Sequence, residues 1–351
     1  MPTESGFVVE YLVRREQWQA FLEGIAGDRH VYALSSPHDG PVHLQPTDIL
    51  PASPQHLAPY RSVEPLKTLF FPPRESLGPL MEGRRPSLPE RLVLGVKNCD
   101  LSALQIHDHV FLDTEPVDPY YAEARRKTLL VSSDCTDAPE VCFCTAVGEQ
   151  PYPVEGFDLN LSPVSQGAIV ETGSERGEAA LESLRADLAQ AESAHLEERN
   201  ARRERLAHRV AGQAEAGGLR AGLDLQHMVE RSREASLWEE FAQDCVECGA
   251  CNFVCCTCHC FLLADGLDSS GRPARAKLWD SCLYRNFARV AGGANPRAHR
   301  TERLYNRFEK KFSFFPRVLE RYACDGCGRC IEACTGRIDI RAVLKRAADE
   351  S

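Results

Sequence analysis

Sixteen cysteines occur among the 351 residues, and half of them form two copies of one spacing motif. The copies are Cys245-x2-Cys248-x2-Cys251-x3-Cys255 and Cys324-x2-Cys327-x2-Cys330-x3-Cys334. Closely spaced cysteines on a turning loop direct several thiolates inward, as an iron–sulfur cubane requires. Gly249, Gly326 and Gly328 give these loops the backbone freedom that such wrapping needs. The spacing therefore predicts two [4Fe–4S] clusters.

The division of ligands between the two clusters follows from a rule for two-cluster ferredoxins, in which the fourth cysteine of each run binds the other cluster. Structural zinc is the alternative, but zinc usually takes two separated C-x2-C pairs, and two complete runs disfavour it. Proline commonly follows the fourth cysteine, whereas Cys256 and Thr335 stand there in this chain. Proline is not a ligand, so the ligation is unaffected, and Cys256 is expected to be a non-ligand. One cluster is predicted to take Cys245, Cys248, Cys251 and Cys334, and the other Cys324, Cys327, Cys330 and Cys255.

The first half of the chain is predicted to form a scaffold of α/β type. Short apolar runs at residues 92–96, 129–132 and 167–172 predict buried strands, and helical stretches separate them. This alternation indicates an α/β-type domain over residues 1–173. Residues 174–240 are rich in Glu, Arg, Ala and Leu at helical spacing, which predicts a helical linker.

The remaining residues, 241–351, are predicted to form a dicluster ferredoxin domain, so that the whole chain is α+β. The chain between the two cysteine runs is far longer than in a minimal bacterial ferredoxin. Residues 274–290 and 300–312 have patterns typical of helix. We therefore expect an α-helical dicluster domain that resembles the one in succinate dehydrogenase iron–sulfur subunits. A basic patch near the C-terminus is expected to face a partner subunit or solvent; it comprises Arg303, Arg307, Lys310, Lys311 and Arg317.

Composition narrows the class of protein. The 41 basic and 51 acidic residues give a formal net charge of −10, which argues against a nucleic-acid binder. The sequence has no run of about 18 apolar residues that would predict a membrane-spanning helix. The N-terminus lacks the pattern of a secretory signal, so a cytoplasmic location is expected. Thiols are kept reduced there, so the cysteines indicate metal ligation or redox chemistry and not a disulfide framework.

Further motifs lie outside the two cysteine runs, and together they resemble a known family. The chain resembles, from about Arg91 to Ala347, the β subunit of cytoplasmic NAD(P)-linked [NiFe] hydrogenases (sulfhydrogenases) and the A subunit of anaerobic sulfite reductase. The matching residues are Gly95-Val96-Lys97-Asn98-Cys99-Asp100-Leu101, Asp118-Pro119-Tyr120-Tyr121, Asp134-Cys135-Thr136, Cys142-Phe143-Cys144-Thr145, Gly156-Phe157-Asp158-Leu159, Cys258-His259-Cys260-Phe261, Trp279-Asp280-Ser281-Cys282, Ala291-Gly292-Gly293-Ala294-Asn295 and Cys327-Gly328-Arg329-Cys330-Ile331.

The resemblance implies an electron-transfer subunit with no catalytic residue of its own. Such a subunit sits between a flavin-bearing, NAD(P)-binding partner and a catalytic subunit of [NiFe] hydrogenase or sulfite reductase type, which places FAD on the partner. The chain agrees in lacking a G-x-G-x-x-G dinucleotide motif. Two other functions stay open. The N-terminal domain could hold a flavin, as in β subunits of coenzyme-F420-reducing hydrogenases, or the clusters could be structural parts of an assembly protein.

The other cysteines fall into two groups. Four of them lie within family-matching motifs of the N-terminal domain, which suggests a third [4Fe–4S] cluster; they are Cys99, Cys135, Cys142 and Cys144. The alternative is that they are small buried apolar residues. Cys258, Cys260 and Cys282 could line a cluster, tune its potential, join the third site or serve in packing.

Overall fold

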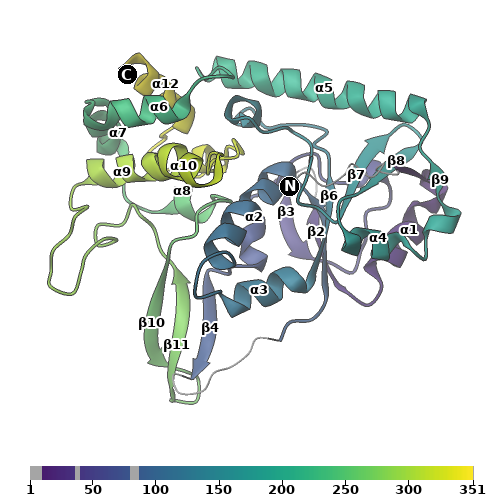
Figure 1. Cartoon of the computed structure of the whole chain (residues 1–351), viewed down its shortest axis with the longest axis horizontal. Helices are drawn as coiled ribbons and strands as arrows, with labels where there is room; N and C mark the ends of the chain where they lie inside the picture. The colour runs from purple at the N-terminus through teal and green to yellow at the C-terminus, as the bar shows by residue number, and fades with distance from the viewer. Residues whose placement is uncertain (1–9, 36–39, 80–86, 351) are drawn as a thin grey trace.

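A large mixed sheet forms the centre of the N-terminal part of the chain (Figure 1). The computed structural model describes residues 10–35, 40–79 and 87–350. The middle strands β2, β5, β6 and β7 are parallel, and antiparallel strands extend the sheet at both edges. In spatial order the strands are β3 (His43–Pro46), β2 (His30–Ser35), β5 (Arg91–Val96), β6 (Thr128–Ser133), β7 (Leu159–Val164), β8 (Gly167–Thr172), β1 (Tyr11–Arg14) and β9 (Ala189–Gln190). The three strands predicted from apolar runs are all present.

Helices cover both faces of this sheet, which explains why its central strands β5, β6 and β7 are buried along their whole length. In β5, Leu92 and Leu94 pack on the face that α1 (Trp18–Ala26) covers. Val93 points to the other face, against α2 (Asn98–Phe111). Two further helices, α3 (Pro119–Arg126) and α4 (Glu175–Leu181), complete the layers. The predicted α+β class is thus confirmed.

The helices of the C-terminal part form a second core around Trp238, Phe308 and Phe312. The long helix α5 (Ser193–Ala216) runs along one side of the molecule, from the large sheet to this helical core (Figure 1). The other helices are α6 (Leu225–Arg231), α7 (Leu237–Asp244), α8 (Ala250–Phe253), α9 (Arg300–Glu309), α10 (Phe315–Leu319), α11 (Arg329–Glu332) and α12 (Ile340–Asp349). A π-helical turn, Lys310–Phe314, joins α9 to α10. Short 3-10 turns are Arg15–Gln17, Pro54–His56, Leu66–Leu69, Cys144–Val147, Arg185–Asp187 and Ser232–Glu234.

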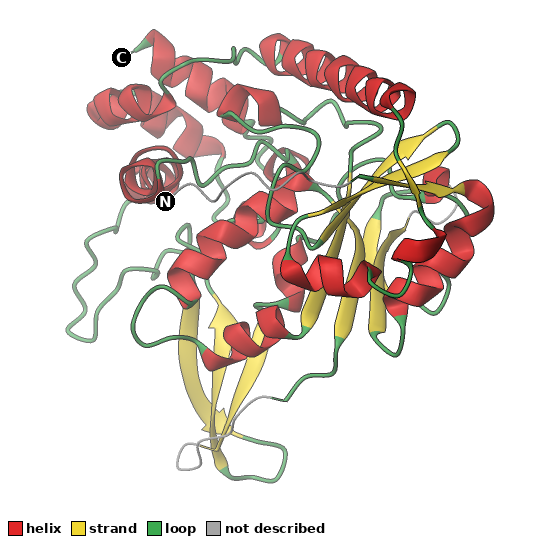
Figure 2. Cartoon of the chain, turned by 45° about the vertical axis from the view of Figure 1, so that its right-hand side comes forward, coloured by secondary structure: helices red, strands yellow, loops and turns green. Residues whose placement is uncertain are grey.

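A second, three-stranded sheet projects from the body of the molecule (Figure 2). Its order is β10 (Phe261–Leu267), β11 (Pro273–Trp279) and β4 (Arg74–Pro79). The prediction of helix over residues 274–290 was therefore wrong: β11 is a strand because it pairs with β10 on one side and with β4 on the other. This sheet pairs β4, which precedes the predicted linker, with β10 and β11, which follow it. The division of the chain into domains at 1–173, 174–240 and 241–351 therefore stays a prediction.

Candidate metal centres

The four cysteines that the sharing rule assigns to one cluster line a single cavity, which we call site 1. They are Cys245, Cys248, Cys251 and Cys334, and the cavity volume is about 40 Å³. The loops that supply them lie close together, because a Cβ atom on Gly336 would be 2.1 Å from the carbonyl oxygen of Asp244. The backbone N–H of Ile338 donates to Sγ of Cys334 at 3.3 Å. Hydrogen bonds of this kind raise the reduction potential of a bound cluster.

The second predicted set, which we call site 2, comprises Cys255, Cys324, Cys327 and Cys330. Burial raises the pKa of Cys330, and the neighbouring sulfurs of Cys255 and Cys327 raise it further. Burial likewise raises the pKa of Cys324, with Cys330 and Cys255 adding to the effect. Hydrogen bonds from neighbouring thiols instead lower the pKa of Cys255 and lower that of Cys327 to about 6. A bound metal takes all four cysteines as thiolates. The structure therefore brings these four sulfurs into one neighbourhood that suits metal ligation.

Four further cysteines lie beside sites 1 and 2. Sγ of Cys256 is 3.8 Å from Sγ of Cys327 and donates to Oδ2 of Asp325 at 3.3 Å. On the site 1 side, Cys282 packs against Cys245. The thiol of Cys258 forms a hydrogen bond with Cys255, and burial together with the nearby Cys282 raises the pKa of Cys260.

Buried cations surround sites 1 and 2, and sequence reasoning misplaced three of them. Arg303, Arg307 and Lys311 were expected at a surface patch, yet they are only 2%, 5% and 4% exposed. Lys311 donates to Sγ of Cys255 at 3.1 Å and to the carbonyl oxygen of Ala323 at 2.9 Å. Burial alone would lower the pKa of Lys311, but the adjacent cysteine sulfurs hold it well above its ordinary value. The signal that could have revealed this face is the spacing of four residues between successive cations, which places all three on one side of a helix.

Two of the buried guanidinium groups have N–H groups that an anionic cluster could satisfy. Within the described residues, one terminal nitrogen of Arg307 and one of Arg329 are buried without a hydrogen-bond partner. Buried, unsatisfied N–H groups are costly and call for an explanation. Arg307 lines the cavity of site 1, and Arg329 follows Gly328 in the second cysteine run. A cluster with anionic thiolate ligands and sulfide would supply the missing hydrogen-bond acceptors.

The four N-terminal cysteines line a cavity of their own, which we call site 3. Cys99, Cys135, Cys142 and Cys144 enclose a volume of about 30 Å³, close to that of site 1. The backbone N–H of Phe143 donates to the carbonyl oxygen of Gly326 at 2.8 Å. A Cβ atom on Gly326 would lie 2.5 Å from the backbone of Cys144. The loop of site 3 thus packs directly on the loop of site 2.

The large sheet explains why the first two cysteines of site 3 meet. Cys99 follows β5 and Cys135 follows β6, and the carboxyl ends of adjacent parallel strands lie at the same edge of a sheet. Cys99 also lies in the first turn of α2, where the helix dipole stabilises negative charge. Lys97, which is fully buried, donates to Oγ of Ser133 at 2.7 Å and to the carbonyl oxygen of Asp134 at 3.0 Å. These bonds hold the two strand ends in register.

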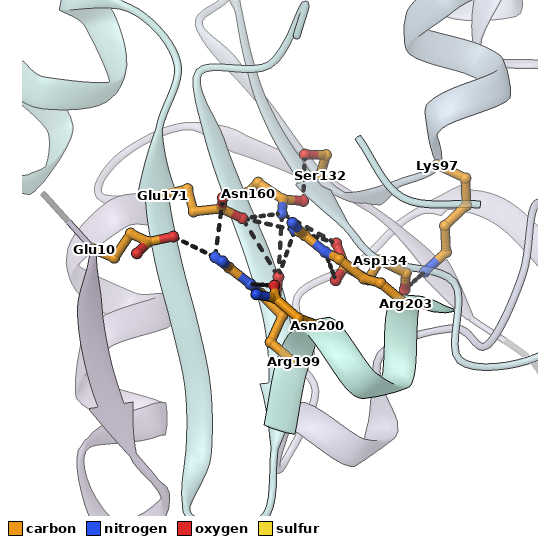
Figure 3. Close-up of polar contacts among 10 residues, drawn as sticks. Glu10, Lys97, Ser132, Asp134, Asn160, Glu171, Arg199, Asn200 and Arg203 are labelled. Carbon is orange, nitrogen blue, oxygen red and sulfur yellow. Dashed lines mark hydrogen bonds and ion pairs between the residues drawn. The ribbon is translucent and has the colours of Figure 1, made fainter. Parts of the chain in front are cut away.

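Helix α5 packs over site 3. It also anchors the end of β6 through a network of polar contacts (Figure 3). Arg203 forms ion pairs with Asp134 at 2.7 Å and with Glu171 at 2.8 Å. Arg199 pairs with Glu10 and Glu171 in the same network. One and two turns beyond Arg203, Leu206 and Val210 pack against Cys135, Cys142 and Cys144 of site 3. The segment predicted only as a linker therefore forms part of a candidate site, which its composition alone did not reveal.

The three sites are contiguous. Cys330 of site 2 lines the cavity of site 1, and Cys327 of site 2 lines the cavity of site 3. Site 2 therefore lies between the other two. Among the described residues, no three His, Cys, Asp or Glu side chains form a group suited to a single metal ion.

The match to a family model agrees with the geometry of sites 1 and 2. The model described as a 4Fe-4S dicluster domain matches residues 244–338, so this part of the chain is similar to domains that hold iron–sulfur clusters. More particularly, the chain is 29% identical over 290 residues to the protein named Sulfhydrogenase 2 subunit beta of Pyrococcus furiosus, and the match covers 81% of this chain and 83% of that relative. The resemblance to sulfhydrogenase β subunits is confirmed. No helix in the described ranges is long and apolar enough to span a membrane.

Proposed function

We propose that this chain is an iron–sulfur electron-transfer subunit that holds three [4Fe–4S] clusters in a row. The observation that carries the proposal is that three sets of four cysteines are contiguous, with a residue of site 2 in the wall of each neighbouring cavity. A row of one-electron centres is a path for electrons. Site 1 would be held by Cys245, Cys248, Cys251 and Cys334; site 2 by Cys255, Cys324, Cys327 and Cys330; site 3 by Cys99, Cys135, Cys142 and Cys144.

The chain's own contribution is to hold and tune these centres. Each cluster supplies one-electron redox chemistry. Lys311, Arg307 and Arg329 place buried positive charge beside the sulfurs, which favours the more negative, reduced state. No cysteine of sites 2 and 3 is exposed, and half of them are buried, whereas Cys248 of site 1 is exposed. We infer that site 1 is the end of the path that exchanges electrons with another protein.

The relative is named as one subunit of a sulfhydrogenase, which supports a role for this chain within a complex. We propose that this chain also works within a complex, where it relays electrons between a flavin-bearing, NAD(P)-binding subunit and a catalytic subunit of hydrogenase or sulfur-reductase type. On this proposal the FAD belongs to the partner. A sulfite reductase complex would use the same conduit with another terminal subunit.

Anaerobic purification of the chain, alone and with the proteins that accompany it, tests this proposal. The isolated chain should contain about twelve irons and no flavin, because three [4Fe–4S] clusters hold twelve. An iron content of about eight would show that site 3 holds no cluster. Mass spectrometry should find a flavin-binding subunit and a [NiFe] subunit; a sirohaem protein would assign the chain to sulfite reduction. Flavin on the isolated chain, with oxidation of a nicotinamide, would overturn the non-catalytic assignment.

A further inference from the structure

Site 1 reaches the surface beside a segment of unusual charge. All sixteen cysteines lie in the described ranges, and Cys248 is the exposed one. Val246, two residues before it, is 64% exposed and lines the same cavity. From Ser281 to Thr301 the sequence contains no Asp or Glu, although acidic residues outnumber basic ones by ten in the whole chain. The segment therefore differs in charge from the rest of the molecule.

Four arginines of this face surround site 1, and we call them the basic rim: Arg285, Arg289, Arg300 and Arg337. All four are exposed, and within the part of the chain that the structure describes no ion pair involves any of them. Two carboxylates lie near the rim in the sequence of the first cysteine loop. Glu247 forms an ion pair with the buried Arg303, and Asp244 is exposed.

Backbone and packing contacts place the rim around the cluster site. Phe287, between the first two rim arginines, packs with the cysteines of site 1. The ring of Tyr284 would be 3.1 Å from a Cβ atom on Gly249, so the chain before Arg285 lies on the first cysteine loop. The side chain of Arg300 donates to the carbonyl oxygen of Ala242 at 3.0 Å, at the end of α7 that leads into Cys245.

Arg337 and the segment that carries Arg285 and Arg289 also lie beside site 1. The backbone N–H of Arg337 donates to the carbonyl oxygen of Cys334 at 3.0 Å. Asn295 holds the segment closed by donating to the carbonyl oxygen of Arg285 at 2.9 Å. The loop between β11 and α9 projects from the body of the molecule in both views (Figures 1 and 2). The basic rim is thus presented outward, next to the exposed sulfur of site 1.

We propose that the basic rim is a docking surface for an electron-carrier protein with an acidic face, which exchanges electrons with site 1. The inference rests on the proposed function, because it needs a cluster at site 1. Unpaired arginines around an exposed redox centre attract a complementary negative surface and speed the encounter of the two proteins. The overall negative charge of this chain would repel an acidic carrier elsewhere, so the rim also directs where the carrier docks.

The test uses the full chain with its clusters and an acidic [2Fe–2S] ferredoxin as the probe. Stopped-flow mixing of the dithionite-reduced chain with oxidised ferredoxin gives the rate of electron transfer, and biolayer interferometry gives the binding affinity of the oxidised proteins. The variant carries Arg285→Glu, Arg289→Glu and Arg337→Glu. The matched control carries Arg14→Glu, Arg15→Glu and Arg220→Glu, three exposed arginines that line none of the cysteine cavities.

The rim variant should lose at least about tenfold in both rate and affinity at low salt, and its remaining rate should no longer fall as salt is added. The control should behave as the native chain. Equal rates for the rim variant and the control would overturn the inference, as would a native rate that does not depend on salt. Self-association of the native chain that the rim variant abolishes would assign the rim to a second copy and overturn it too.

Two further measurements separate this inference from the proposed function. Iron content and the electron paramagnetic resonance spectrum show whether the variant keeps its clusters. Re-oxidation of each reduced protein by an uncharged quinone shows whether site 1 still exchanges electrons. A variant with normal clusters and normal quinone oxidation isolates the rim as the cause. A native chain without clusters would instead refute the proposed function.

Discussion

Lys311 is the residue whose replacement should move a cluster potential most cleanly. Its ammonium group lies 3.1 Å from Sγ of Cys255 and is 4% exposed, so solvent screens it little. Coulomb's law with an effective dielectric constant of about 20 gives about 5 kcal/mol for unit charges at that separation. For a one-electron couple this is an upper bound of about 230 mV.

The added electron is shared by the whole cluster at site 2 and is not held on one sulfur, so only part of this bound applies. We expect Lys311→Met to lower the potential of one cluster by about a quarter of the bound, or about 60 mV. The direction follows because the variant removes a positive charge that favours the reduced state. Lys310→Met is the matched control, since Lys310 is the adjacent residue but is exposed.

An anaerobic redox titration followed by electron paramagnetic resonance measures the potentials in both variants. We predict that one potential falls in Lys311→Met while the others move much less, and that Lys310→Met matches the native chain. An unchanged or raised potential in Lys311→Met would refute it. Equal shifts in the two variants would refute it as well, because the effect would then not depend on burial beside Cys255.

Two further predictions concern the packing of the sites. Gly326→Ala should remove at least about four irons per chain, because its Cβ would lie 2.5 Å from the backbone of Cys144. Gly222→Ala is the control, since Gly222 also has a positive φ but a Cβ there would meet nothing within 4 Å. This control should keep the native iron content. Arg329→Leu should lower the free energy of unfolding by about 3–5 kcal/mol, since it leaves the buried Asp100 carboxylate without its 2.6 Å ion pair. Anaerobic urea titration measures this loss, and adding Asp100→Asn should recover part of it; a loss below about 1 kcal/mol would contradict the prediction.

The local patterns of the sequence were sufficient where local physics decides the structure. Residues 92–96 and 129–132 are apolar because both faces of these strands are buried, and such runs are visible without a structure. The spacing of the two cysteine runs likewise fixed which residues could meet. The strand Pro273–Trp279 was missed because its partners include β4, about 200 residues earlier, and pairing across that separation leaves no local signal.

The buried cations were misplaced for a different physical reason. Burying Arg307 and Lys311 requires counter-charge, and the sequence offers no carboxylate that meets this need at helical spacing. The compensating charge comes from cysteine sulfurs, which a bound metal holds as thiolates. Helix α5 was predicted as a linker for another reason. Its Val210 lines site 3, but the four cysteines of that site come from three other segments of the chain. The composition of the helix that covers the site therefore cannot reveal it.

The most direct test of the three-cluster path is the iron and sulfide content of the native chain beside that of a Cys135→Ser, Cys142→Ser variant, both prepared anaerobically. The native chain should hold about twelve irons and the variant about eight, with the resonance signals of the two dicluster sites retained. Cys282→Ser, outside the three ligand sets, should stay at about twelve. About eight irons in both the native chain and the double variant would contradict the account, because the N-terminal cysteines would then hold no cluster.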